Sequence, residues 1–165
     1  MRLRARSWLV AVAVLAASGL MPAHAQGEDE ESVQAVLILS GECTSLELAG
    51  RAAPGCVGTL TNSTYSTGRS SFMFLAGDVA LVSFSGMSGD DLRQGDSIVQ
   101  PLDLVTFRVL GAGINAMPTK AIGTCRHTNP FAGVATINCT AETKAGRFSA
   151  TFRTDGEPPT VHEYD

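Results

Sequence analysis

The chain has 165 residues, of which 44% are hydrophobic and 17% charged, and its formal net charge is −4 at pH 7. This length suits one domain with a sizeable core rather than two. Nucleic-acid recognition needs a basic stripe, and an acidic chain with almost no lysine does not supply one, so we expect no nucleic-acid partner.

Residues 1–25 have the pattern of a signal peptide. Three arginines precede an apolar run from Trp8 to Ala17, and Ala23-His24-Ala25 is a small-x-small cleavage site. The run is shorter than the roughly 20 residues that a membrane-spanning helix needs, so we expect cleavage before Gln26 and no transmembrane anchor. Cleavage would remove three of the twelve basic residues, leaving nine against sixteen acidic residues. The mature protein is expected in the periplasm or the extracellular medium.

The mature chain is predicted to have three parts. Residues 26–32 are an acidic leader, which we expect to be disordered because it has little apolar surface to bury. Residues 33–153 form a single β domain. Residues 154–165 are an acidic tail containing Pro158-Pro159, which we expect to be extended and mobile.

The β domain is predicted from short runs of apolar, β-branched and threonine residues separated by turn residues. A first run ends at Gly41, and Pro101 marks the beginning or the edge of a later strand. No window has the spacing of an amphipathic helix. The predicted strands cover 33–40, 44–49, 57–63, a hairpin at 71–85, 98–110, 121–128, 134–141 and 147–153.

The hairpin from Ser71 to Ser85 is the centre of the predicted sheet. Gly77-Asp78 between two apolar runs is typical of a two-residue loop. Both faces would then be apolar, so we expect the hairpin to be covered on both sides. In this register one face carries Phe72, Phe74, Ala76, Val79, Leu81 and Ser83, and the other carries Met73, Leu75, Ala80, Val82 and Phe84.

The chain has four cysteines, Cys43, Cys56, Cys125 and Cys139. An even number in an exported chain predicts two disulfides. A turn centred on residue 132 would place Cys125 opposite Cys139, which leaves Cys43 to pair with Cys56 through a β-bulge or an irregular turn near Gly50. The short C-x-x-C spacing of zinc sites is absent, so we predict no metal ligation by these residues.

These features together predict an all-β fold. We expect a small antiparallel up-and-down barrel, or a strongly curled sheet or sandwich, of seven to eight strands with two disulfides. The residues do not resemble the motif set of a characterised family.

Few residues of the mature chain suggest catalysis. His127 and His162 are its only histidines, and no nucleophile motif accompanies them, so we expect no enzyme and read His127 as a rim residue whose replacement by alanine would change any activity less than about tenfold. The loop at 86–96 contains three aspartates, but their spacing is not that of a calcium loop. We predict a polar turn there, with calcium binding left open, and no cofactor or metal elsewhere.

The remaining prediction is a binding role. We expect an interaction module, such as an inhibitor or an envelope accessory protein, whose partner is an unidentified envelope or extracellular protein. A barrel that carries a small apolar ligand is an alternative, and an unrecognised hydrolase is a second. The candidate contact residues are Asn129, Pro130 and Phe131 at a hairpin tip, although Phe131 could instead fold back and cover the end of the barrel.

Overall fold

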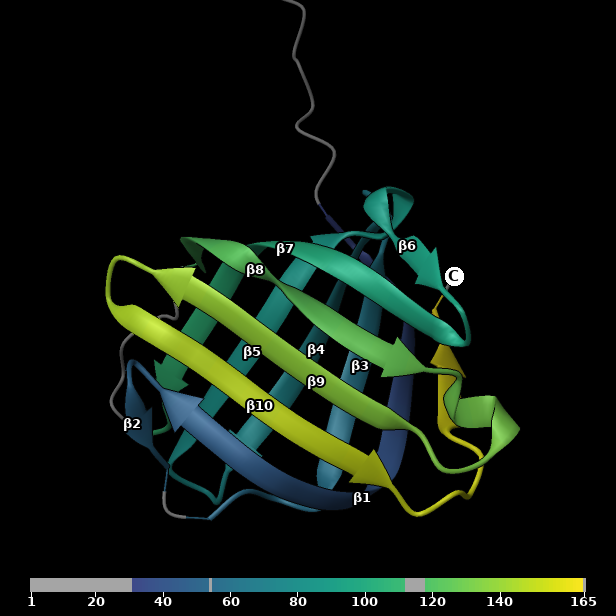
Figure 1. The fold of residues 1–165 in the computed structure, drawn as a ribbon, viewed down its shortest axis with the longest axis horizontal. Coiled ribbons are helices and arrows are strands. Elements are labelled where there is room, and N and C mark those ends of the chain that lie inside the picture. Colours follow the sequence, from purple (N-terminus) through teal and green to yellow (C-terminus); the bar gives the residue numbers. More distant parts are fainter. Residues whose placement is uncertain (1–30, 54, 112–117, 165) are drawn as a thin grey trace, which may run out of the picture. The chain divides into compact units, whose positions relative to one another are not determined.

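Eight strands close into an antiparallel barrel (Figure 1). The computed structural model describes residues 31–53, 55–111 and 118–164, and the chain from Glu31 onward forms one unit. Around the barrel the order is β1-β3-β4-β5-β7-β8-β9-β10, and β10 pairs back with β1 to close the ring. This confirms the predicted all-β class and selects a barrel over a sandwich.

The barrel strands are β1 (Val33–Leu48), β3 (Thr59–Tyr65), β4 (Arg69–Ala76), β5 (Ala80–Met87), β7 (Ser97–Val109), β8 (Pro118–Thr128), β9 (Thr136–Thr143) and β10 (Gly146–Thr154). Three short strands extend the sheet: β2 (Arg51–Ala52) and β11 (Thr160–Glu163) pair with β1, and β6 (Leu92–Gln94) pairs with β7. Two short 3-10 turns are η1 (Ser88–Asp90) and η2 (Pro130–Ala132). Within the described ranges no helix is long and apolar enough to cross a bilayer.

The interior of the barrel is packed with apolar side chains. Alternate residues of each strand point inward, and the pairing aligns them in rows, so Phe74 lies opposite Val82 and Phe84 opposite Val105. The rings of Phe74 and Phe84 meet edge to face with their centroids 5.7 Å apart. Each such buried side chain contributes about 1.5–3 kcal/mol to folding. The fully buried apolar side chains include Phe74, Phe84, Phe152, Leu60, Ile137, Val82 and Val105.

Strand β1 is one long strand, whereas the sequence predicted two strands separated at Gly41. A Cβ atom at residue 41 would overlap the carbonyl oxygen of Arg153, so glycine permits the close approach of β10 rather than ending the strand. At this point β1 changes its neighbour. It pairs with β11 as far as Ile38 and with β10 from Gly41 onward.

The disulfide between Cys125 and Cys139 confirms the predicted β8–β9 hairpin. The two residues are directly opposite in the register, and their Cα atoms are 4.0 Å apart. Both side chains are buried inside the barrel. The bridge therefore fixes the two strands just below the turn that joins them.

The second predicted disulfide, between Cys43 and Cys56, is also present, with Cα atoms 5.4 Å apart. The irregularity that it requires is not near Gly50, as expected, but between Cys43 and Ser45 of β1. An extra residue there breaks the alternation of side chains along β1. Cys43 and Leu46 are three residues apart, yet both pair with inward residues of β10.

The β4–β5 hairpin has a three-residue loop, not the predicted two-residue loop at Gly77-Asp78. Ala76 pairs with Ala80, and Val79 lies in the loop, where the residue is 54% exposed. The apolar, β-branched Val79 favoured a strand in the sequence and so concealed the third loop residue. The true inner face carries Phe72, Phe74, Ala76, Ala80, Val82 and Phe84, while the outer face with Met73, Leu75 and Leu81 is half-buried rather than covered.

Residues 86–96 were predicted to form a loop, but they contain the end of β5, the turn η1 and the strand β6. Strand β6 folds back on β7 through a two-residue turn at Gly95-Asp96, which places Gln94 opposite Ser97. Pro101 lies within β7, between the part paired with β5 and the part paired with β6, and not at the beginning of the strand.

The buried side chain of Gln100 connects β7 to β4 and β5 where the regular pairing of β5 with β7 has ended. Its Nε2 donates to the carbonyl oxygens of Ser70 and Gly86, at 3.2 and 3.1 Å, and to the Ser70 hydroxyl at 2.8 Å. These bonds satisfy polar groups that would otherwise be costly to bury.

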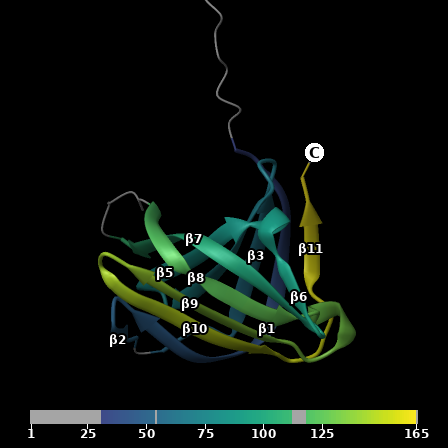
Figure 2. The same cartoon turned by 45° about the horizontal axis from the view of Figure 1, so that its top comes forward.

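The segment 154–165 differs from the mobile tail that we expected. After β10 the chain turns at Gly156 and forms β11, in which Thr160 pairs with Ile38 and Glu163 with Ala35. Figure 2 shows β11 (yellow) rising at one edge of the barrel, where it pairs with the first half of β1. The predicted signal peptide, residues 1–25, and most of the predicted leader lie outside the described residues.

Candidate functional site

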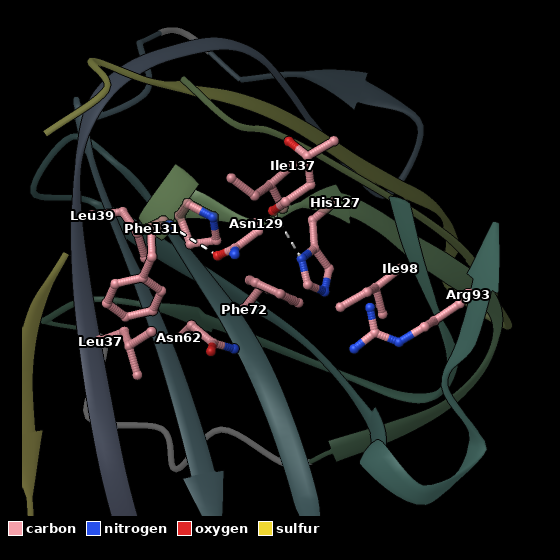
Figure 3. A pocket seen from close by; sticks show the side chains of 12 residues that line it. Leu37, Leu39, Asn62, Phe72, Arg93, Ile98, His127, Asn129, Phe131 and Ile137 are labelled. Carbon is pink, nitrogen blue, oxygen red and sulfur yellow. Dashed lines mark hydrogen bonds between the residues drawn. The ribbon is translucent and has the colours of Figure 1, made fainter. Parts of the chain in front are cut away.

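A cavity of about 310 Å³ opens at the end of the barrel where β10 gives way to β11 (Figure 3). We call it the mouth cavity. On the N-terminal side of Gly41 the strand β1 pairs with β11 and no longer with β10, so the walls of the barrel separate there. One wall is formed by β1, β3 and β4, and the other by β6, β7, β8, β9 and the η2 turn. The described residues that line it are Leu37, Leu39, Asn62, Phe72, Arg93, Ile98, His127, Thr128, Asn129, Pro130, Phe131 and Ile137.

The strand register explains why these side chains face one space. Leu37 is opposite Asn62, and Asn62 is opposite Phe72, so the three share the inner face of one wall. On the other wall Ile98 is opposite His127, which is opposite Ile137. Asn62 is fixed by a hydrogen bond of 3.0 Å from its Nδ2 to the carbonyl oxygen of Ser71. The floor is therefore mainly apolar, with polar groups at defined points.

Arg93 supplies the positive charge of the mouth cavity. It is opposite Ile98 in the β6–β7 pair, so its side chain starts on the face that looks over the opening. Figure 3 shows its guanidinium reaching past Ile98 toward the side of the cavity that holds His127 and Phe72. Sequence analysis missed this residue because the glycines and aspartates around it indicated a loop.

His127 is half-buried in the wall of the cavity. Its ring lies against that of Phe72, with centroids 5.2 Å apart, and its Nδ1 is 3.3 Å from the carbonyl oxygen of Thr128. Burial lowers the pKa of the imidazole, while the Thr128 carbonyl and the charge of Asp91 act in the opposite direction. His127 therefore lies inside the opening, deeper than the rim position predicted from the sequence.

The predicted contact residues Asn129, Pro130 and Phe131 form the edge of the same cavity. The side chain of Asn129 caps the η2 turn, because its Oδ1 accepts a hydrogen bond of 3.0 Å from the backbone N–H of Phe131. Phe131 is 54% exposed and stands over Leu37 in Figure 3. The tip is thus ordered, and its aromatic ring is neither wholly solvent-facing nor part of the core.

The base of this tip is connected to the last residue of β10. The backbone N–H of Ala135 donates to the Thr154 hydroxyl at 2.7 Å, and the N–H of Thr154 donates to the Ala135 carbonyl at 2.9 Å. With the disulfide between Cys125 and Cys139, these bonds hold η2 in a fixed position relative to the barrel.

A larger hollow of about 680 Å³ lies on the outer wall around Ile122, which is 84% exposed. Its charged lining side chains are Asp103, Lys120, Glu142 and Lys144. Because both signs are equally present and Asp103 is already paired with Arg69, this hollow indicates no particular ligand chemistry. Within the described residues there is also no group of three or more His, Cys, Asp or Glu side chains placed to hold a metal ion.

Comparison of the chain with protein-family models, with curated proteins and with solved structures gave no match.

Proposed function

We propose that this protein is an exported, non-enzymatic binding module whose ligand occupies the mouth cavity. A disulfide-containing β-barrel is compatible with a small secreted binding module. The observation that carries the proposal is the cavity itself. A barrel that is otherwise packed leaves about 310 Å³ between apolar walls with a few polar groups, and this is the usual composition of a ligand site.

The surroundings of His127 support leaving catalysis out of the proposal. A nucleophilic mechanism would need the imidazole within hydrogen-bond reach of a hydroxyl and a carboxylate. Within the described residues, the imidazole of His127 is hydrogen-bonded to the carbonyl oxygen of Thr128. A carbonyl oxygen can replace neither the hydroxyl nor the carboxylate.

Calorimetry with 1-octanol, a neutral probe with an apolar body, tests the proposal. Leu37→Trp should fill the cavity from β1 and reduce binding at least tenfold, because Leu37 lines it and is only half-buried. Leu81→Trp, on the half-buried outer face of β5, is the matched control and should bind as the wild type does. Equal binding by both variants, or no binding by the wild type, would refute the proposal.

A second candidate is the docking of an exported protein on Phe131. It is favoured by the exposure of this ring on a capped turn, since a fixed aromatic side chain loses little entropy when it is buried by a partner. Phe131→Ala should leave the melting temperature within about 2 °C of the wild type, because the ring is half exposed. If the variant also loses a protein that the wild type captures from envelope extract, the docking role is supported; if capture is unchanged, that role is excluded.

A further inference from the structure

We infer that the ligand of the mouth cavity is a small amphipathic carboxylate, with an apolar body of about eight carbons and one negative charge placed between Arg93 and His127. This inference rests on the proposed function and adds the chemical class of the ligand.

The sign of the charge follows from Arg93. Of the described residues that line the cavity, Arg93 alone carries a full charge at neutral pH, and the ion pairs formed within the described ranges do not include it. A guanidinium offers a planar pair of N–H donors that matches a carboxylate. A cationic or neutral ligand would leave that group without a charged partner at the opening.

The size of the apolar body follows from the volume and the lining. About 310 Å³ corresponds to the liquid volume of roughly ten water molecules, so a ligand of about ten non-hydrogen atoms would fill it. The surfaces that such a body would contact are aliphatic and aromatic. They are provided by Leu37, Leu39, Phe72, Ile98, Ile137 and Phe131.

His127 is placed to respond to the charge of the ligand. Its bond to the Thr128 carbonyl is made by the tautomer that carries a proton on Nδ1, which leaves Nε2 on the cavity side of the ring (Figure 3). A carboxylate near Nε2 favours a second proton there. The charge of Asp91 also favours the protonated form of the ring. Arg93 lines the same cavity, and its positive charge would oppose protonation. Binding of the anion should therefore be accompanied by the uptake of a fraction of a proton below pH 6.5, the ordinary pKa of a histidine.

Three probes of equal length separate charge from size: octanoate, 1-octanol and octylamine, measured by calorimetry at pH 7.5. We expect octanoate to bind at least tenfold more tightly than 1-octanol, because a charge-assisted hydrogen bond is worth about one to two orders of magnitude in affinity, and octylamine to bind most weakly. Arg93→Gln should remove the preference for octanoate over 1-octanol. Arg108→Gln, an exposed arginine near the opposite end of the barrel, is the charge-matched control and should behave as the wild type.

The outcomes distinguish this inference from the proposed function. If 1-octanol binds as tightly as octanoate, or if Arg93→Gln leaves the preference for octanoate intact, the anionic ligand is refuted while the cavity remains a binding site. If none of the three probes binds to the wild type, both the proposed function and the inference are wrong. Equal losses in Arg93→Gln and Arg108→Gln would also refute the role of Arg93, since a general charge effect would explain them.

Discussion

At the scale of single residues, the sequence singled out the tip that lines the mouth cavity but not the arginine that lines it with the tip. Asn129 and Phe131 were recognised because a proline between them, in a turn between two cysteine-bearing strands, indicates a fixed tip. Arg93 was missed because its strand has three residues, which is too short to show an alternating pattern. The glycines and aspartates around it are also the residue types that are common in turns. The signal that could have found it is Gly95-Asp96, a two-residue loop between Gln94 and Ser97.

The burial of His127 predicts a pH dependence of stability. Burial lowers the pKa of the imidazole in the folded state. Between the ordinary pKa of about 6.5 and the lower pKa of the folded state, the unfolded chain therefore binds more protons than the folded chain. Stability contributed by the neutral ring is therefore present above pH 6.5 and lost below it, by at most about 1.4 kcal/mol per pH unit. Asp91 and the Thr128 carbonyl reduce this effect.

Urea unfolding of the wild type and of His127→Gln between pH 5 and pH 7.5 measures this contribution. The wild type should lose more stability than the variant as the pH falls. His162→Gln, which changes an exposed histidine of β11, should keep the pH dependence of the wild type. A pH dependence that is the same in all three proteins would show that the imidazole of His127 is not buried in solution.

At the scale of the elements, β4 and β7 are connected across β5 by an ion pair on the outer surface. Arg69 of β4 binds Asp103 of β7 through two hydrogen bonds, Nη1 to Oδ1 at 2.6 Å and Nη2 to Oδ2 at 2.9 Å, and Nη1 also donates to the Ser85 hydroxyl of β5 at 3.3 Å. The hydrogen bonds from Arg69 hold the pKa of the Asp103 carboxyl below its usual range, although desolvation acts against this. Asp103 lies at the point where β7 is irregular, between Leu102 and Leu104.

Asp103→Asn should destabilise the barrel by about 1 kcal/mol at neutral pH, because the carboxylate is half exposed and its interactions are partly screened by solvent. The depressed pKa means that the wild type keeps this stabilisation above pH 4 and loses it as the pH falls through the folded value. The difference in melting temperature between the two proteins should therefore shrink as the pH falls below 4. Glu157→Gln, an exposed change in the loop before β11, should match the wild type throughout. A difference between Asp103→Asn and the wild type that does not shrink below pH 4 would contradict the ion-pair explanation.

The elements themselves were largely predictable, and the errors have local causes. Strand periods, turn residues and an even number of cysteines gave the all-β class and the β8–β9 hairpin. Gly41 was read as a strand end because glycine weakens strands, but here it allows two backbones to approach closely. The strand β11 was not predicted because Pro158-Pro159 and the acidic residues around them are typical of an extended tail, and its pairing with β1 depends on contacts more than 100 residues apart in the chain.

At the scale of the whole molecule, the two disulfides join different pairs of segments in the barrel wall. Cys125–Cys139 joins β8 to β9 below the mouth cavity, and Cys43–Cys56 joins β1 to the segment before β3. Each bridge closes a loop of 13 or 14 residues. Because it lowers the entropy of the unfolded chain, each bridge should add about 3 kcal/mol to the free energy of unfolding.

Replacing both Cys125 and Cys139 by alanine should lower the melting temperature by about 10 °C and weaken probe binding, because the η2 turn loses its fixed base. The matched variant lacking Cys43 and Cys56 should lose similar stability but retain binding, since these residues do not line the cavity. Differential scanning calorimetry and titration of 1-octanol provide the two measurements. Equal binding by the two double variants would show that the hairpin disulfide does not support the site.

The most direct test of the mouth cavity is to locate a bound probe by NMR. Nuclear Overhauser effects between the methyl end of octanoate or 1-octanol, whichever binds more tightly, and the assigned side chains of the protein report contacts of a few ångströms. We predict cross-peaks to Phe72, Ile98 and Ile137. Cross-peaks confined to Ile122 on the outer wall, or to Phe107 and Val109 at the opposite end of the barrel, would contradict the assignment of the mouth cavity as the binding site.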